Sequence, residues 1–219
     1  MCGRFTQRKD PKKLAEYYGV EDPYVAASPR YNIAPQQMIL AVTSDRQIVE
    51  LKWGLIPSWA KDPKIANNLI NARAETLQEK PSFRTALAKR RCLIPADGWY
   101  EWKKEADGKQ PYFFHRLDDG LFSFAGLWEA WNSPEGETIQ TCTIITTEPN
   151  ELTGQYHHRM PAILKRSDEA LWLDSMARVS DLVQLLAPCS ADDLEVYAVS
   201  RAVNSPGRDD FALIERIEQ

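Results

Sequence analysis

The sequence contains no long hydrophobic run. Nowhere do apolar residues approach the roughly 20 consecutive positions that a membrane-spanning helix requires. The first ten residues, MCGRFTQRKD, also lack the apolar stretch of a secretory signal. We therefore expect a protein without membrane association and with a cytoplasmic location.

Histidine and cysteine are both scarce. The chain has 3 histidines and 4 cysteines, and the cysteines lie far apart, without the paired spacing of metal ligands. We therefore expect neither a metal nor another cofactor. Cys92, Cys142 and Cys189 lie among apolar or small residues, which predicts reduced, buried, passive thiols. Cys2 alone has an unusual position.

An excess of positive charge is also absent. The net charge of −4 argues against a protein whose whole surface binds nucleic acid, but it permits a local basic cleft. Guanidinium groups interleaved with aromatic rings suit single-stranded nucleic acid, because they meet phosphates and bases respectively. Candidates for such a cleft are Arg4, Arg73, Arg84, Lys89, Arg90, Arg91 and Arg159, with Trp53, Trp59 and Phe83. We interpret Lys89 to Arg91 instead as the solvated part of a charged helix.

Strand–helix alternation is missing, which excludes a doubly wound fold. Alternating apolar residues and turn signals predict strands at 38–43, 47–53, 92–94, 98–103, 111–117, 121–128, 138–146 and 194–199. Helices are predicted at 10–19, at 82–91 with Ser82 as its cap, at 149–152, at 167–173 with Ser167 as its cap, and at 179–187. We expect an α+β fold, with a mainly antiparallel sheet or barrel-like core and peripheral helices. Without repeats or a long linker, residues 1–219 are expected to form a single domain and a monomer.

Cys2 becomes chemically distinctive if Met1 is removed. A small second residue normally permits that removal, which gives one residue an α-amine with a pKa of about 8 and a thiol with a pKa of about 8.5. With an aldehyde, the amine forms an imine and the thiol closes a five-membered thiazolidine, favoured by its proximity. The alternative is that position 2 holds an incidental small residue.

The segment GWYEWKK, residues 98–104, surrounds a carboxylate with aromatic rings. In a strand, Trp99, Glu101 and Lys103 share one face. Desolvation there would raise the pKa of Glu101 toward general acid–base use. A strand whose exposed face happens to carry a glutamate explains this segment equally well.

Two further segments carry polar groups suited to catalysis. His157 or His158 can act as an acid or base near neutral pH, and Arg159 can bind a phosphate with two hydrogen bonds. Asn71 and Arg73 lie at strand spacing, so both project to one face, where an asparagine can orient a nucleophile. Taken singly, each segment also fits an ordinary loop or a surface position.

Several motifs together resemble a known family. They are MCGRF at the start, YNIAP (31–35), WGLIPSWAKDP (53–63), NARAET (71–76), CLIPADGWYEWKK (92–104), HHRMPAIL (157–164) and SRAVNSP (200–206). In this order they resemble the SRAP family, the SOS-response-associated peptidases also called abasic site processing proteins. The resemblance covers nearly the whole chain.

The resemblance implies a catalytic set and a DNA partner. Cys2 matches the N-terminal nucleophile that crosslinks to an abasic sugar in single-stranded DNA, and Asn71 matches the residue that positions it. Glu101 matches the glutamate credited with proton transfer, and His157 the catalytic histidine. Arg4, Arg73 and Arg159 match phosphate-binding positions, and Trp59, Phe83 and Arg84 lie where the family contacts or wedges DNA.

Other functions remain open on the residues alone. A glutamine amidotransferase of the N-terminal-nucleophile type can also begin Met-Cys-Gly, with the amine as base and the thiol attacking an amide. A non-covalent single-strand DNA-binding module would use the basic and aromatic residues without Cys2. A cysteine peptidase acting on other proteins is a further alternative suggested by the family name.

Overall fold

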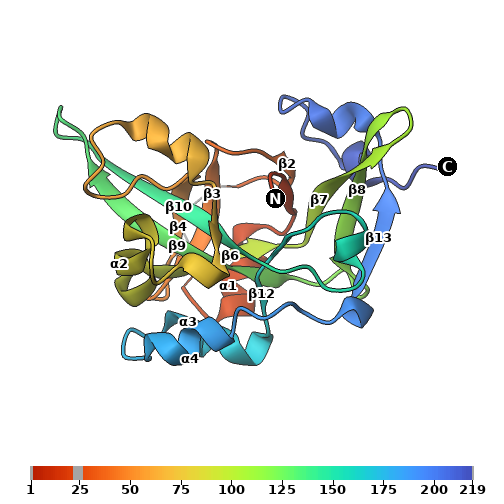
Figure 1. The fold of residues 1–219 in the computed structure, drawn as a ribbon. Helices are drawn as coiled ribbons and strands as arrows, with labels where there is room; N and C mark the ends of the chain where they lie inside the picture. The colour runs from red at the N-terminus through yellow and green to blue at the C-terminus, as the bar shows by residue number, and fades with distance from the viewer. Residues whose placement is uncertain (1, 22–26, 219) are drawn as a thin grey trace.

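The chain folds around two β-sheets that lie side by side (Figure 1). The computed structural model describes residues 2–21 and 27–218. The larger sheet contains β3 (Met38–Thr43), β4 (Ile48–Trp53), β5 (Asn71–Arg73), β6 (Arg91–Ala96), β9 (Phe122–Asn132), β10 (Thr138–Thr147), β11 (Met160–Pro161) and β12 (Ile163–Leu164). The smaller sheet has the order β13-β8-β7-β1-β2, built from Leu194–Ala198, Gly108–Arg116, Gly98–Glu105, Phe5–Gln7 and Arg30–Ile33.

Five strands of the larger sheet close into a barrel. Their order is β10-β4-β3-β6-β9, and β9 pairs back onto β10 from Asn132 opposite Thr138 to Gly126 opposite Ile144. All pairings in both sheets are antiparallel except those of β10 with β4 and β5. The predicted α+β fold with a mainly antiparallel, barrel-like core is therefore confirmed.

Helices lie at the periphery of the barrel, with α2 on one side and α3 and α4 at one end (Figure 1). The α-helices are α1 (Pro11–Tyr18), α2 (Pro81–Lys89), α3 (Glu169–Leu173) and α4 (Val179–Gln184). Short 3₁₀ helices span Pro63–Asn68, Ala74–Thr76, Thr153–Gln155, Arg166–Asp168, Ala191–Asp193, Arg201–Asn204 and Phe211–Ile214. The predicted caps of α1 are confirmed, because the Asp10 side chain accepts from Lys13 N–H and Gly19 adopts φ +61°.

Several predicted boundaries are wrong for local physical reasons. The second helix begins at Pro81, whose fixed φ suits the first helical position, so Ser82 is not its cap. Arg91 starts β6 rather than ending that helix. Residues 149–152 form no helix, and Ser167 is not a cap, because the α3 cap position is occupied by Asp168. Strands β1 and β2 were not predicted, since each is too short to show clear alternation.

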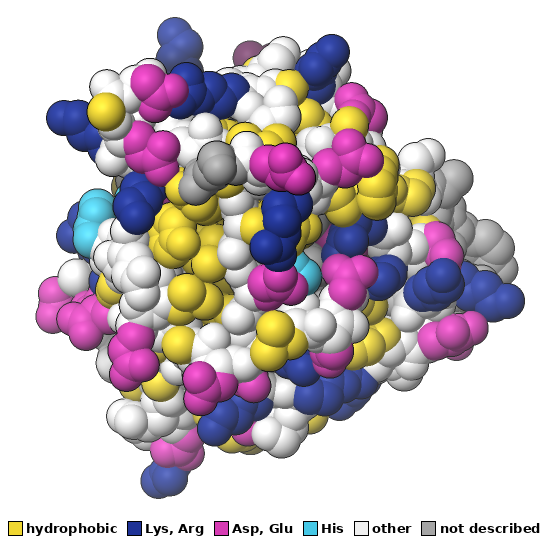
Figure 2. Space-filling model, turned by 90° about the vertical axis from the view of Figure 1, so that its right-hand side faces the viewer, with side chains coloured by type: hydrophobic (Ala, Val, Ile, Leu, Met, Phe, Trp, Pro, Cys, Tyr) yellow, Lys and Arg dark blue, Asp and Glu magenta, His cyan; other side chains and the backbone are white. Residues whose placement is uncertain are grey.

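The smaller sheet carries the C-terminal segment on its outer side. Figure 2 views the molecule from this side, and basic and acidic side chains are interspersed there in small groups. Asn32 of β2 is fully buried and donates hydrogen bonds to the carbonyls of Val203, Ser205 and Arg208 at 3.2, 3.0 and 2.7 Å. This segment is therefore tied to the strand beside β1.

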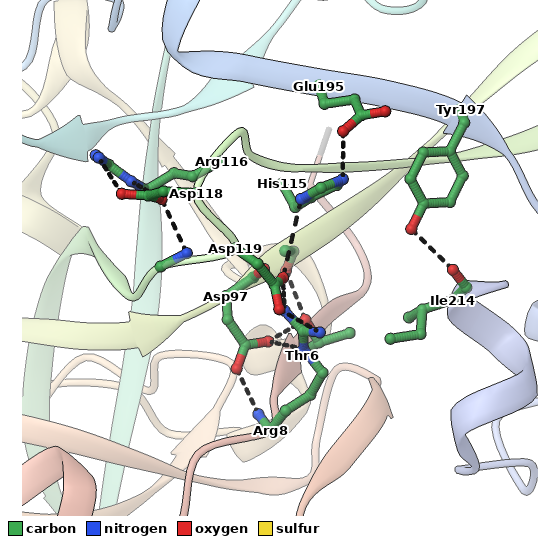
Figure 3. A network of polar contacts seen from close by, with 12 residues as sticks. Thr6, Arg8, Asp97, His115, Arg116, Asp118, Asp119, Glu195, Tyr197 and Ile214 are labelled. Carbon is green, nitrogen blue, oxygen red and sulfur yellow. Dashed lines mark hydrogen bonds and ion pairs between the residues drawn. The ribbon is translucent and has the colours of Figure 1, made fainter. Parts of the chain in front are cut away.

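A buried polar network holds β1 in the smaller sheet (Figure 3). Asp97, between β6 and β7, is fully buried and accepts from Thr6 Oγ1 at 2.6 Å, Arg8 N–H at 2.7 Å and Arg8 Nε at 2.8 Å. Arg8 also contacts Asp119 at 2.5 Å, and His115 lies 3.9 Å from Asp119. Because each group has a charged or polar partner, the network fixes the strand that follows Cys2.

Arg91 joins the ends of two helices to the barrel. Its side chain is buried, and Nη1 donates to the carbonyls of Leu87 and Ala88 in the last turn of α2, each at 2.8 Å. Nε donates to the carbonyl of Trp172 in α3 at 2.7 Å. A cation is favourable at helix C-termini, where carbonyls lack intrahelical partners. Arg91 therefore lies in the core and not, as predicted, on a solvated helix.

We expect Arg91→Met to lower the free energy of unfolding by on the order of 3 kcal/mol, because it leaves helix-end carbonyls without donors. Urea denaturation would measure this loss. Lys89→Ala, two residues earlier and exposed, is the control and should change stability by less than about 1 kcal/mol. Equal stability of the two variants would contradict a structural role for the buried guanidinium.

Candidate functional site around Cys2

Cys2 lies at the junction of the two sheets. Its side chain is fully buried, and its backbone carbonyl accepts a 2.8 Å hydrogen bond from Asn71 Nδ2. Asn71 belongs to β5, which runs parallel to β10 with Asn71 opposite Ile144. Burial, followed by the negative charge of Glu101, raises the pKa of the Cys2 thiol well above its ordinary value. The buried side chain is therefore a neutral thiol at physiological pH.

Glu101 reaches the same junction from β7. β1 pairs antiparallel with β7, with Phe5 opposite Trp99, and Tyr100 N–H donates to the Arg4 carbonyl at 3.0 Å. Continuing this register places the segment next to Cys2 opposite Glu101. The carboxyl is 1% exposed, and burial raises its pKa to about 7. Near neutral pH both protonation states are populated, as a proton-transfer group requires.

His157 lies on the loop that precedes β11. Its Nδ1 lies 3.0 Å from the backbone N of Arg159 and 3.1 Å from the Arg159 carbonyl oxygen, so the Arg159 backbone holds this ring nitrogen. Burial lowers the pKa of His157 to about 4, so the ring is neutral at pH 7. The ring of the adjacent Tyr156 packs against that of Tyr112, with 4.6 Å between the ring centroids, and Tyr112 is the cross-strand partner of Glu101. This contact brings the histidine loop to the β7–β8 pair.

Two of the predicted phosphate-binding arginines have partners within the protein. Arg4 donates from Nη1 to Asn32 Oδ1 at 2.8 Å and to the Val203 carbonyl at 2.6 Å. Arg159 forms two 2.9 Å bonds to the carboxylate of Glu75. Hydrogen bonds within the protein thus hold both guanidinium groups in place.

The other predicted DNA contacts differ in exposure. Trp59 is 57% exposed, and Arg73 and Arg84 are also exposed. Phe83 is 2% exposed and belongs to the same buried cluster as Leu87, on the inner face of α2. The predicted contact between the Phe83 ring and DNA is therefore not available in this conformation, whereas Arg84 on the same helix is accessible.

Sequence reasoning missed three residues of this region: Glu75, Tyr112 and Tyr156. Glu75 lies within the NARAET motif, two residues after Arg73, so a carboxylate among the arginines was a usable signal. The tyrosines gave no such signal, because their contact joins β8 to a loop more than 40 residues away. The described residues contain no group of three or more His, Cys, Asp or Glu side chains that could hold a metal ion. Among the same residues, no helix is long and apolar enough to span a membrane.

Comparison with models of protein families identifies the family of this chain. The model described as SOS response associated peptidase (SRAP) matches residues 1–206. The chain belongs to the SRAP family. This agrees with the resemblance seen in the motifs.

Relatives of this SRAP chain include named proteins of bacteria and vertebrates. The abasic site processing protein YoqW of Bacillus subtilis is 48% identical, and the alignment covers 98% of this chain and 99% of the relative. The abasic site processing protein HMCES of Gallus gallus is 35% identical over 83% of this chain and 64% of the relative. A crystal structure of a Bacteroides thetaiotaomicron protein superposes with a TM-score of 0.91 at 30% identity, covering 99% of this chain and 100% of that one.

Glu101 should make stability of this SRAP chain depend on pH. Its pKa is about 7 in the folded state against 4.5 ordinarily, so ionisation costs stability progressively as the pH rises from 4.5 to 7. Glu101→Gln removes that cost. We expect the variant to gain on the order of 3 kcal/mol over the parent at pH 8 and little at pH 4.5, measured by thermal denaturation.

The matched control is Glu79→Gln, because Glu79 is an exposed carboxylate elsewhere in the chain. Its melting temperature should follow that of the parent at every pH. A stability difference for Glu101→Gln that is the same at pH 4.5 and pH 8 would show that the buried carboxyl is not the titrating group.

Proposed function

We propose that this chain processes abasic sites in single-stranded DNA by forming a covalent thiazolidine with Cys2. The observation that carries the proposal is the placement of Cys2 beside Asn71 and the electrostatic contact of its thiol with Glu101. The names of the SRAP relatives, which are abasic site processing proteins, support the choice of lesion. Such a linkage would protect the lesion from strand cleavage.

The first step is removal of Met1, which lies outside the described residues. Hydrolysis of the Met1–Cys2 peptide bond, by the chain itself or by an aminopeptidase, frees the α-amine of Cys2. The fixed Cys2 carbonyl, held by Asn71, would keep the new terminus in place during this change. An amine that remains at the junction of the sheets can then reach a sugar bound there.

The second step joins protein and sugar without a redox change. Glu101 assists opening of the abasic deoxyribose to its aldehyde by moving a proton. The Cys2 amine attacks C1′ and water leaves to give an imine; the thiol then adds to the same carbon, and its proton moves to nitrogen. The net reaction is aldehyde plus aminothiol giving thiazolidine plus water. No external oxidant, metal or cofactor is needed for this balance.

The neighbouring residues have supporting roles in this proposal. His157, neutral at pH 7, works with Glu101 in reversal of the adduct or in a slow lyase-type side reaction. Arg4, Arg73 and Arg159 supply positive charge near the site, and Arg84 and Trp59 extend the contact along the strand. Confining positive charge to this region reconciles DNA binding with a net charge of −4.

We expect the protein to form a denaturation-resistant adduct with an abasic single-stranded oligonucleotide, and Cys2→Ala to form none. Intact mass spectrometry would show the protein without Met1 plus the oligonucleotide minus one water. Cys189→Ala, at a half-buried cysteine outside the site, is the matched control and should crosslink normally.

Three results would each reject a part of this proposal. Equal crosslinking by Cys2→Ala would exclude Cys2 as the nucleophile. Salt-dependent binding without any adduct would favour a non-covalent single-strand DNA-binding module. Glutaminase activity without an adduct would favour the amidotransferase alternative.

A further inference from the structure

Among the described residues, Glu75 is the one acidic side chain that forms an ion pair with Arg159. Its two carboxylate oxygens accept from Nη1 and Nη2 of Arg159, each at 2.9 Å, in the parallel arrangement that fixes a guanidinium most firmly. Arg159 Nη2 also donates to the carbonyl of Thr146 in β10 at 2.6 Å. Three separate segments therefore meet at one guanidinium: the turn after β5, β10 and the loop before β11.

The same arginine positions the imidazole of His157 through its backbone. The N–H of Arg159 donates to His157 Nδ1 at 3.0 Å, and β11 begins at the next residue, Met160, paired with Thr147. Arg159 is thus anchored by its side chain on one side and by β11 on the other. Any shift of Arg159 therefore alters the contacts of its backbone with His157 Nδ1.

The exposure of the two partners indicates that the ion pair has a local role. The side chain of Arg159 is 10% exposed, whereas that of Glu75 is 45% exposed. Partial burial acts to raise the pKa of Glu75, but hydrogen bonds from Arg159 outweigh it and keep this pKa below its usual range. A half-exposed carboxylate contributes little to global stability because solvent screens it. Its removal should therefore disturb Arg159 without unfolding the chain.

We propose that Glu75 is a positioning residue that acts on His157 through Arg159. Glu75 holds the guanidinium, the guanidinium fixes the backbone of Arg159, and that backbone holds the imidazole at Nδ1. The catalytic part of this inference rests on the proposed function, in which His157 supports reversal of the adduct. The structural part, the link from Glu75 to His157, does not depend on it.

A double-mutant cycle tests the catalytic part. Purified adduct would be made with the parent protein, Glu75→Ala, His157→Ala and the double variant, and the release of DNA would be followed over time. We expect each single variant to slow release by on the order of 10-fold. The double variant should be no slower than His157→Ala, because both changes remove the same contribution. Multiplicative effects, or normal release by Glu75→Ala, would overturn the proposal.

Nuclear magnetic resonance titration of His157 tests the structural part without DNA. In the parent we expect a pKa of about 4 for His157; in Glu75→Ala the chemical shift of Nδ1 should move, because its contacts with the Arg159 backbone are altered. An unchanged Nδ1 shift would refute the link. If no variant forms an adduct, the proposed function fails, and this titration still decides the role of Glu75.

Two variants keep the result interpretable. Glu79→Ala removes an exposed carboxylate four residues away and should leave both the release rate and the titration unchanged. Glu75→Gln retains one acceptor oxygen for Arg159 and should give an intermediate effect in both measurements. If Glu75→Gln behaves like the parent while Glu75→Ala does not, a hydrogen bond without the negative charge is sufficient to hold Arg159. If neither variant differs from the parent, the proposal is wrong.

Discussion

The position of Cys2 depends on how firmly the short strand after it is held. β1 has three residues, so its pairing with β7 and β2 supplies only a few backbone hydrogen bonds. Asp97 adds to these by accepting from Thr6 and from both the backbone and the guanidinium of Arg8. The carboxylate has no exposure, so its charge is compensated only by these donors, and releasing the strand would leave it unpaired. The location of Cys2 thus follows from the buried ion pair of Asp97 with Arg8, six residues along the chain.

At the candidate site, burial shifts the pKa values of different side chains in opposite directions. Burial favours the neutral form of every titratable side chain, so it raises the pKa of Cys2 and Glu101 and lowers that of His157. Near pH 7 the thiol and the imidazole are therefore neutral, whereas Glu101 is divided between its two protonation states. Glu101 can accordingly accept or donate a proton near neutral pH at small energetic cost.

Sequence patterns predicted the parts of this structure that depend on local order. The caps Asp10 and Gly19 and the long strands of the barrel follow from periodicity or turn chemistry, whereas the strand pattern left the burial of Glu101 as one of two alternatives. The pairing of Arg159 with Glu75 does not, because it joins residues 84 positions apart. Phe83 was expected to contact DNA, and only the packing of α2 on the barrel shows that its ring lies inside. The roles of Asn71 and His157 came from the family resemblance, and the geometry supplies a physical reason for considering them.

The full burial of Cys2 has a consequence for the chemical durability of the protein. Peroxides and alkylating agents react with thiolates, and they react fastest where the sulfur is accessible. A sulfur atom that is covered and kept protonated escapes both conditions, although a terminal cysteine in solution would be among the first groups to be lost. The fold therefore keeps this thiol in an unreactive form. A reactant that only collides with the protein surface does not reach this sulfur atom.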